Sequence, residues 1–151
     1  MDTTAYHAAP ARLRNTPSWL LSQATAHAHR LVWAAFADAG VRRYHYALLA
    51  ALEEYGPASQ AELGRRCGID RSDVVAALNE LAGRDLVRRS PDPADRRRNI
   101  VTVTTAGVRH LGLLDESLDR AQDELLTGLS PDERAQLVRL LARVLEHHSP
   151  R

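Results

Sequence analysis

The sequence predicts a mainly α-helical fold with one small β-hairpin wing: a winged helix-turn-helix extended by a helical dimerisation region. Three observations predict it. Two short helical patterns meet at a tight connector, residues 68–70. Two strand-like runs follow at once, on either side of a turn-rich stretch. Long amphipathic helical patterns lie near both ends of the chain, so the short middle elements are framed by helices.

The first long helix is expected to begin with Thr16 as the N-cap and Pro17 in the first helical position, and to end at Gly40. Its apolar stripe is wider than one contact face requires. Residues 1–16 lack clear periodicity, and we expect an N-terminal arm without regular structure there. The remainder, 17–151, is predicted to be a single domain.

The middle of the chain predicts three short helices. "YHYALLAALEEYGP" gives the first and "SQAELGRRCGI" the second, which ends at Gly68. "DRSDVVAALNELAGRDL" gives the third, with Asp70 as N-cap and Asp73 placed to answer it. Its expected buried row consists of Val74, Leu78 and Leu81. The second and third helices form the predicted helix-turn-helix.

The strands of the hairpin are expected in "LVRRS" and "NIVTVT", which flank "PDPADRRR". A long helix follows Thr105–Ala106–Gly107, and a last one begins with the capping box of Ser130 and Glu133. We therefore expect a winged helix-turn-helix lobe over 41–104 and dimerisation helices over 17–39 and 105–148. The terminal helices carry more apolar surface than the lobe could cover, which favours a homodimer over a monomer.

Composition excludes several classes of protein. The chain is 44% hydrophobic and 26% charged, which is ordinary for a folded domain. Arginine outnumbers acidic residues over 60–100, and acidic residues outnumber arginine over 109–146. The single cysteine and the absence of an apolar leader or spanning segment favour a cytoplasmic protein. No nucleophile motif, phosphate-cradling loop or cluster of metal ligands is present, so we expect neither an enzyme nor a cofactor.

Residues 55–107 and 129–145 resemble the MarR family of bacterial transcription regulators, and the segment from Leu86 to Thr104 with "DPADRRR" inside it is the most specific part. The resemblance implies a homodimer that binds double-stranded DNA at a pseudo-palindromic operator, with its recognition helices in successive major grooves. It also implies a repressor that a small aromatic or phenolic acid releases.

The family's Asp-x-Arg wing motif falls on Asp95 and Arg97. The resemblance implies that Arg97 enters the minor groove and that Asp95 holds the arginine or the wing turn. Arg96 and Arg98 would lie beside phosphates. The remaining candidates for DNA contact lie on the recognition helix: Arg71, Ser72, Val75, Ala76 and Asn79. Val75 or Ala76 suits a thymine methyl group, so hydrogen-bonded base readout is expected to be sparse.

For the effector, an indole wall and a basic anchor would suit an aromatic anion. The predicted ligand-binding residues are Arg14, Trp19, His27 and His45. Two alternatives stay open. One is a winged-helix protein–protein adaptor that does not bind DNA. The other is a regulator that senses redox state through Cys67, although the C-terminal end of a helix disfavours a thiolate there.

Overall fold

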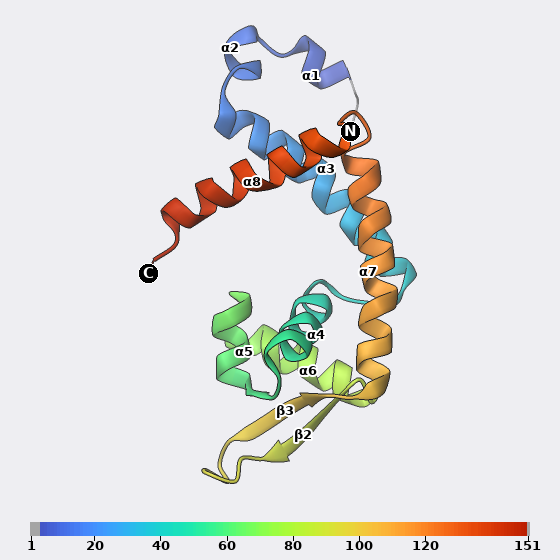
Figure 1. Ribbon diagram of the computed structural model, residues 1–151, viewed down its shortest axis with the longest axis vertical. Helices are drawn as coiled ribbons and strands as arrows, with labels where there is room; N and C mark the ends of the chain where they lie inside the picture. Colours follow the sequence, from blue (N-terminus) through green and yellow to red (C-terminus); the bar gives the residue numbers. More distant parts are fainter. Residues whose placement is uncertain (1–3, 151) are drawn as a thin grey trace. The chain divides into compact units, whose positions relative to one another are not determined.

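The computed structural model describes residues 4–150, apart from the side chains of Thr4 and Arg43, and it consists of two compact units. The first comprises Met1–Leu31 and Ala121–Arg151, and the second comprises Val32–Arg120. The elements in chain order are labelled in Figure 1. They are α1 (Thr4–Ala8), α2 (Ala11–Arg14), α3 (Pro17–Asp38), α4 (Arg43–Tyr55), β1 (Ala58–Ser59), α5 (Gln60–Cys67), α6 (Arg71–Gly83), β2 (Val87–Pro91), β3 (Asn99–Val103), α7 (Thr105–Leu125) and α8 (Pro131–His148).

The core of the second unit joins α4, α5 and α6 to β3 and α7. Its fully buried side chains are Leu48, Leu49, Leu52, Leu63, Val74, Leu78, Leu81, Val101 and Leu114. The predicted buried row of α6 is confirmed, because Val74, Leu78 and Leu81 each expose 1% or less of their surface. Their spacing of three and four residues puts them on one face of the helix. The opposite face of α6 is therefore left for other contacts.

The turn between α5 and α6 depends on Gly68. Its backbone is left-handed (φ 62°), and its N–H donates to the carbonyl of Gly64. Glycine adopts this conformation without the steric penalty that a Cβ brings. Asp70 follows two residues later and caps α6, as the sequence predicts. The helix-turn-helix is thus set by local signals.

The predicted hairpin is present, and β2 and β3 pair from Val87 with Val103 to Pro91 with Asn99. A third strand, which the sequence did not predict, lies along the other edge of β3. It is the short β1, where Ala58 pairs with Val101 and Ser59 with Ile100. All the pairings are antiparallel. The start of α5 is consequently joined to the base of the wing.

The junction between the wing and α7 is close-packed. Thr104 Oγ1 donates to the Asp85 carbonyl (2.6 Å) and accepts from the Gly107 N–H (3.0 Å), so it caps α7. A Cβ on Gly107 would collide with the carbonyl oxygen of Leu86 and would lie 2.7 Å from Val103 Cγ2. Only glycine fits at this position without displacing its neighbours.

In the first unit, the expectation of an N-terminal arm without regular structure is wrong. Residues 4–8 and 11–14 of the expected arm are helical rather than irregular, while residues 1–3 lie outside the described residues. The Tyr6 ring stacks on Trp19 of α3, with ring centroids 6.3 Å apart. Arg14 Nε donates to the Ala9 carbonyl (3.0 Å). These side-chain contacts hold turns that are too short to show periodicity in the sequence.

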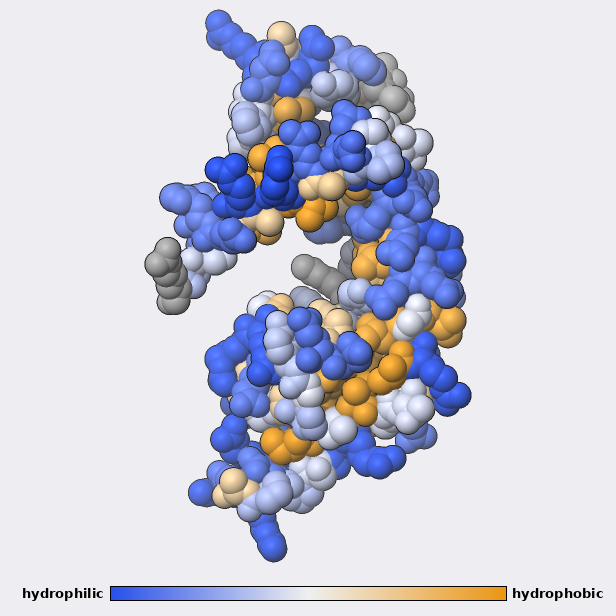
Figure 2. Space-filling view, in the orientation of Figure 1, coloured by the Kyte–Doolittle hydropathy of each residue, from blue (hydrophilic) through white to orange (hydrophobic). Residues whose placement is uncertain are grey.

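Apolar side chains remain exposed on α8. Its capping box of Ser130 and Glu133 is present as predicted, yet none of its residues is buried. Val138 and Leu145 expose 65% and 67% of their surface. Figure 2 shows hydrophobic surface along α8, while the tip of the wing is hydrophilic. Within residues 4–150, no helix is both long and apolar enough to cross a membrane.

Candidate nucleic-acid interface

The first turn of α6 presents its polar groups at the surface. Asp70 Oδ2 accepts from the Ser72 N–H (3.3 Å) and from the Ser72 hydroxyl (2.6 Å). These hydrogen bonds to the carboxylate lower the pKa of Asp70. Asp73 was predicted to pair with this N-cap, but the side chain that contacts the Asp70 carboxylate is that of Ser72. Arg71 and Ser72 are exposed at this end of the helix, where the helix dipole favours an anion.

The wing tip is an ordered loop. The Asp92 N–H donates to the Arg98 carbonyl (2.8 Å), and the Arg98 N–H donates to the Asp95 carbonyl (2.9 Å). Asp92 Oδ1 also accepts from the Ala94 N–H (2.9 Å). The loop therefore closes on its own backbone and aspartate side chains.

Asp95 positions Arg97. Asp95 Oδ1 accepts from the Arg97 N–H (3.1 Å) and lies 3.4 Å from Arg97 Nε. The Arg97 side chain nevertheless exposes 93% of its surface. An ion pair this exposed adds little to stability. Its effect is to restrict the orientation of a guanidinium group that projects into solvent.

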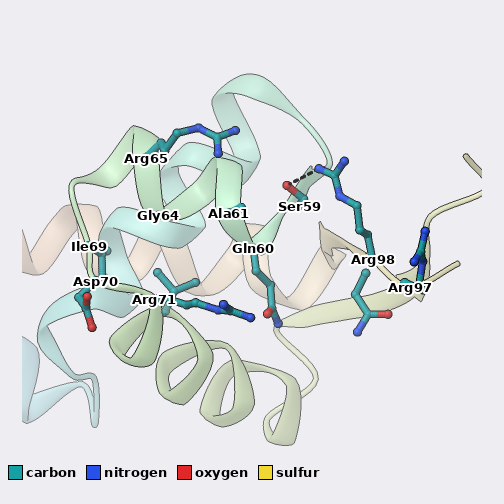
Figure 3. A pocket seen from close by; sticks show the side chains of 12 residues that line it. Ser59, Gln60, Ala61, Gly64, Arg65, Ile69, Asp70, Arg71, Arg97 and Arg98 are labelled. Carbon is teal, nitrogen blue, oxygen red and sulfur yellow. Dashed lines mark hydrogen bonds between the residues drawn. The ribbon is translucent and has the colours of Figure 1, made fainter. Parts of the chain in front are cut away.

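A hollow of about 660 Å³ lies between the wing and the first turns of α5 and α6 (Figure 3). Four arginines line it against a single carboxylate, that of Asp70. The full lining is Ser59, Gln60, Ala61, Gly64, Arg65, Ile69, Asp70, Arg71, Val74, Arg97, Arg98 and Asn99. Figure 3 shows the Arg71 side chain extending toward Gln60, at the start of α5. A concave surface with this excess of arginine suits a phosphate backbone.

Arg98 connects the wing to α5. Its Nη2 donates to Ser59 Oγ (3.3 Å), drawn as a dashed line in Figure 3. Ser59 is buried, caps α5 by accepting from the Glu62 N–H, and pairs with Ile100 in the sheet. The hydroxyl therefore fixes one side of the hollow relative to the other.

The structure brings Arg71, Arg97 and Arg98 together around this hollow. Of the other candidates on α6, Ala76 and Asn79 are exposed and Val75 is half-buried. Arg96 is exposed at the tip and does not line the hollow. Sequence reasoning missed Gln60 and Arg65. The capping box of Ser59 and Glu62 was the available signal, because it marks the helix start at which Gln60 stands.

A second cavity, of about 450 Å³, lies beside α6 and contains His45. Its walls come from the end of α3, the start of α4 and one face of α6. The lining residues are Trp33, Arg42, Tyr44, His45, Asp73, Ala76, Ala77 and Glu80. Two aromatic rings and a few polar groups are the usual lining of a site for a small aromatic molecule.

His45 is buried and in contact with Glu80. Its Nε2 lies 2.8 Å from Glu80 Oε2, while its Nδ1 accepts from the Arg42 N–H (3.4 Å). This pattern fits the neutral imidazole with its proton on Nε2. Burial lowers the pKa of His45, and the hydrogen bond to Glu80 opposes that effect only in part.

The other predicted ligand-binding residues, Arg14, Trp19 and His27, belong to the first unit. All three are half-buried. Arg14 is held by the Ala9 carbonyl, and the Trp19 ring lies against Tyr6. In the second unit, Trp33 and Tyr44 line the cavity that contains His45.

Cys67 has the surroundings of a structural thiol. It is half-buried at the end of α5, and its Sγ donates to the Ala47 carbonyl (3.5 Å). Burial raises the pKa of the thiol. A redox-sensing cysteine needs the opposite shift, because the thiolate is the reactive form.

Comparison with known proteins agrees with this geometry. The MarR family model matches residues 39–98. The chain is 30% identical over 109 residues to the HTH-type transcriptional repressor NicR of Pseudomonas putida, covering 72% of this chain and 69% of NicR. Among solved structures it is similar to the transcriptional repressor CouR bound to a 23-mer DNA duplex, with a TM-score of 0.80, 26% identity, and coverage of 89% of this chain and 96% of CouR.

It is also similar to BpsR of Bordetella bronchiseptica, with a TM-score of 0.76, 26% identity, and coverage of 90% of this chain and 97% of BpsR. The DNA binding of BpsR is regulated by 6-hydroxynicotinic acid. The helix-turn-helix, the wing and the identity with NicR lead to one conclusion: the chain belongs to the MarR family of transcriptional regulators.

Proposed function

We propose that the protein is a sequence-specific, cytoplasmic DNA-binding repressor that acts as a homodimer and leaves its operator when a small aromatic acid binds. The observation that carries the DNA-binding part is the arginine-lined hollow between α6 and the wing. Its four arginines come from α5, α6 and the wing, and an excess of guanidinium groups on a concave surface suits a sugar–phosphate backbone.

The interface divides into two parts. Arg65, Arg71 and Arg98 border the hollow and would neutralise phosphates of one strand. Arg97, held by Asp95 and otherwise exposed, would enter the adjacent minor groove. The exposed face of α6, with Ser72, Ala76 and Asn79, would lie in the major groove with Val75 at its edge. Arg96 would add a phosphate contact at the tip.

The homodimer is proposed from the uncovered apolar side chains of α8, together with the symmetric operators that two winged lobes would bind. The effector class is proposed from the cavity beside His45 and from the likeness to BpsR. Of the predicted ligand residues, His45 is the one that this cavity supports. Arg14, Trp19 and His27 remain candidates for contacts made in the dimer.

The test is binding to the duplex upstream of the protein's own gene, titrated with salt. Arg97→Ala should weaken specific binding by about 1–3 kcal/mol, since it removes a groove contact. Arg98→Ala should reduce the salt slope by about one, because one phosphate contact is lost. Asp95→Ala should lower the ratio of specific to non-specific affinity, since Arg97 loses its orientation while its charge remains.

Arg120→Ala, on the exposed surface of α7, is the control that also removes one positive charge. It should leave the specific affinity and the salt slope unchanged. If the wild type shows no salt-dependent binding to that duplex or to other genomic DNA, the DNA-binding role fails. The winged helix would then act as a protein–protein adaptor.

A further inference from the structure

Arg89 of β2 carries a guanidinium group whose buried donors lack an acceptor. Its Nε and Nη2 atoms are both buried, and the part of the chain that the structure describes offers neither of them a hydrogen-bond partner. These two nitrogens form one edge of the guanidinium group, and such an edge can donate two parallel hydrogen bonds to a carboxylate or a phosphate. A buried donor without an acceptor is unfavourable, and a buried charge without a counter-charge is more so.

Arg89 lies on the inner face of the sheet, between the core and the arginine-lined hollow. Its cross-strand neighbour is Val101, which pairs in turn with Ala58, and both of these residues are buried. Further along β2, Pro91 belongs to the same face and pairs with Asn99, which lines the hollow. β2 is an edge strand, and α6 packs against it. Arg89 therefore stands where the recognition helix meets the wing.

Two other arginines of the wing differ from Arg89 in this respect. Arg97 contacts Asp95 and is otherwise surrounded by water. Arg88 lies on the outer face of the same strand and is exposed, so water solvates its charge. The Nε–Nη2 edge of Arg89 has neither a protein acceptor among the described residues nor access to solvent. An anion from outside the protein would supply the acceptor that this edge lacks.

The proposed docking on DNA brings an anion to this place. With α6 in the major groove and Arg97 in the adjacent minor groove, the sugar–phosphate strand that separates the two grooves must cross between α6 and the wing tip. Arg89 stands on the β2 side of that junction, and it is half-buried, so part of the residue already reaches the surface. Rotation of its long side chain would turn the Nε–Nη2 edge toward a phosphate without breaking a hydrogen bond of either nitrogen.

We propose that Arg89 binds a backbone phosphate of the operator through Nε and Nη2. The proposal rests on the proposed function, in which the protein binds DNA, and it adds a contact outside both the wing-tip motif and the hollow. Because these donors gain an acceptor only in the complex, Arg89 stabilises the complex while it destabilises the free protein. Removing the charge should therefore move DNA affinity and protein stability in opposite directions.

The test compares Arg89→Met with Arg88→Met in the full-length protein. Both changes remove one positive charge from β2 and keep an unbranched side chain, but they lie on opposite faces of the strand. Arg89→Met should weaken operator binding roughly tenfold to a hundredfold and reduce the salt slope by about one. It should also raise the midpoint of urea unfolding, because an apolar group replaces a buried, unpaired charge. Arg88→Met should leave the salt slope and the midpoint at their wild-type values.

A set of duplexes that each carry one uncharged methylphosphonate identifies the contact itself. With the wild type, neutralising one phosphate between the two grooves should weaken binding. With Arg89→Met, the same duplex should bind as well as the unmodified one, since the partner of that phosphate is already gone. Arg89→Lys keeps the charge but lacks the two-nitrogen edge, and it should recover only part of the lost affinity.

The inference is overturned if Arg89→Met lowers the urea midpoint and leaves the salt slope unchanged, because the side chain would then act through packing alone. It also fails if every methylphosphonate weakens the binding of Arg89→Met as much as that of the wild type. Full operator affinity of Arg89→Met contradicts this contact and keeps the proposed function. Failure of the wild type to bind any DNA contradicts the proposed function itself.

Discussion

At the scale of single residues, three charged side chains near the candidate sites are each held by specific neighbours. Asp95 orients Arg97, Ser59 orients Arg98, and Glu80 is held by Arg42 and His45. The first of these pairs could be expected from sequence, because its members are two residues apart in the wing motif. The other two join segments far apart in the chain, and only the fold reveals them.

His45 should make stability depend on pH. Burial lowers its pKa in the folded protein below the ordinary value of 6.5. Just below that value the unfolded chain binds a proton that the folded protein does not, so acid favours unfolding. The contribution of His45 is complete above 6.5 and is lost as the pH falls toward the lowered pKa.

Urea unfolding at a series of pH values should therefore show a smaller acid destabilisation for His45→Gln than for the wild type. Burial also lowers the pKa of His110, and His110→Gln should act in the same direction. Parallel pH profiles for the wild type and His45→Gln would show that the buried imidazole is not a source of the effect.

At the scale of elements, local signals account for what could be predicted. Gly68, Asp70 and the Val74–Leu78–Leu81 row define the helix-turn-helix within a few turns of chain, and all of them are confirmed. The short β1 could not be found in this way. It is a strand only because Ala58 and Ser59 pair with β3, which lies far along the sequence.

The wing–α7 junction gives a prediction at the same scale. Gly107→Ala should destabilise the protein by about 1–3 kcal/mol, because its methyl group would overlap the Leu86 carbonyl and Val103. Gly112→Ala is the matched control in the same helix, with nothing within 4 Å of the added methyl group. It should stabilise by about 0.5–1 kcal/mol, since alanine loses less backbone entropy than glycine in a helix.

Chemical denaturation of the two variants beside the wild type checks both signs. A neutral effect of Gly107→Ala would mean that the strand end and α7 move apart without cost, contrary to the close packing at this junction.

At the scale of the whole molecule, the sequence predicted the order of the main elements, and three of its candidates for DNA contact, Arg71, Arg97 and Arg98, line one hollow. It did not predict that Gln60 and Arg65 line the hollow, or that Trp33 lies beside His45, because each of these contacts depends on how helices pack. The homodimer is the remaining expectation at this scale, and α8 offers the place to test it.

Leu145→Arg should shift the protein from dimer to monomer in sedimentation equilibrium, because it puts a charge among the exposed apolar side chains of α8. Operator affinity should fall with it, since two half-sites would no longer be bound as one unit. Glu146→Arg, at the next exposed position, should preserve the dimer. A Leu145→Arg protein that remains dimeric at the same concentration would place the interface elsewhere.

The closed wing loop has a consequence for the thermodynamics of association. Because Asp92, Asp95 and Arg98 already hold the loop through hydrogen bonds in the free protein, the proposed docking of Arg97 on DNA would require no disorder-to-order transition. The entropy of ordering the loop is lost during folding and not during the encounter with DNA. The heat-capacity change of binding should accordingly reflect only the surface that the duplex covers, without an added contribution from folding of the wing.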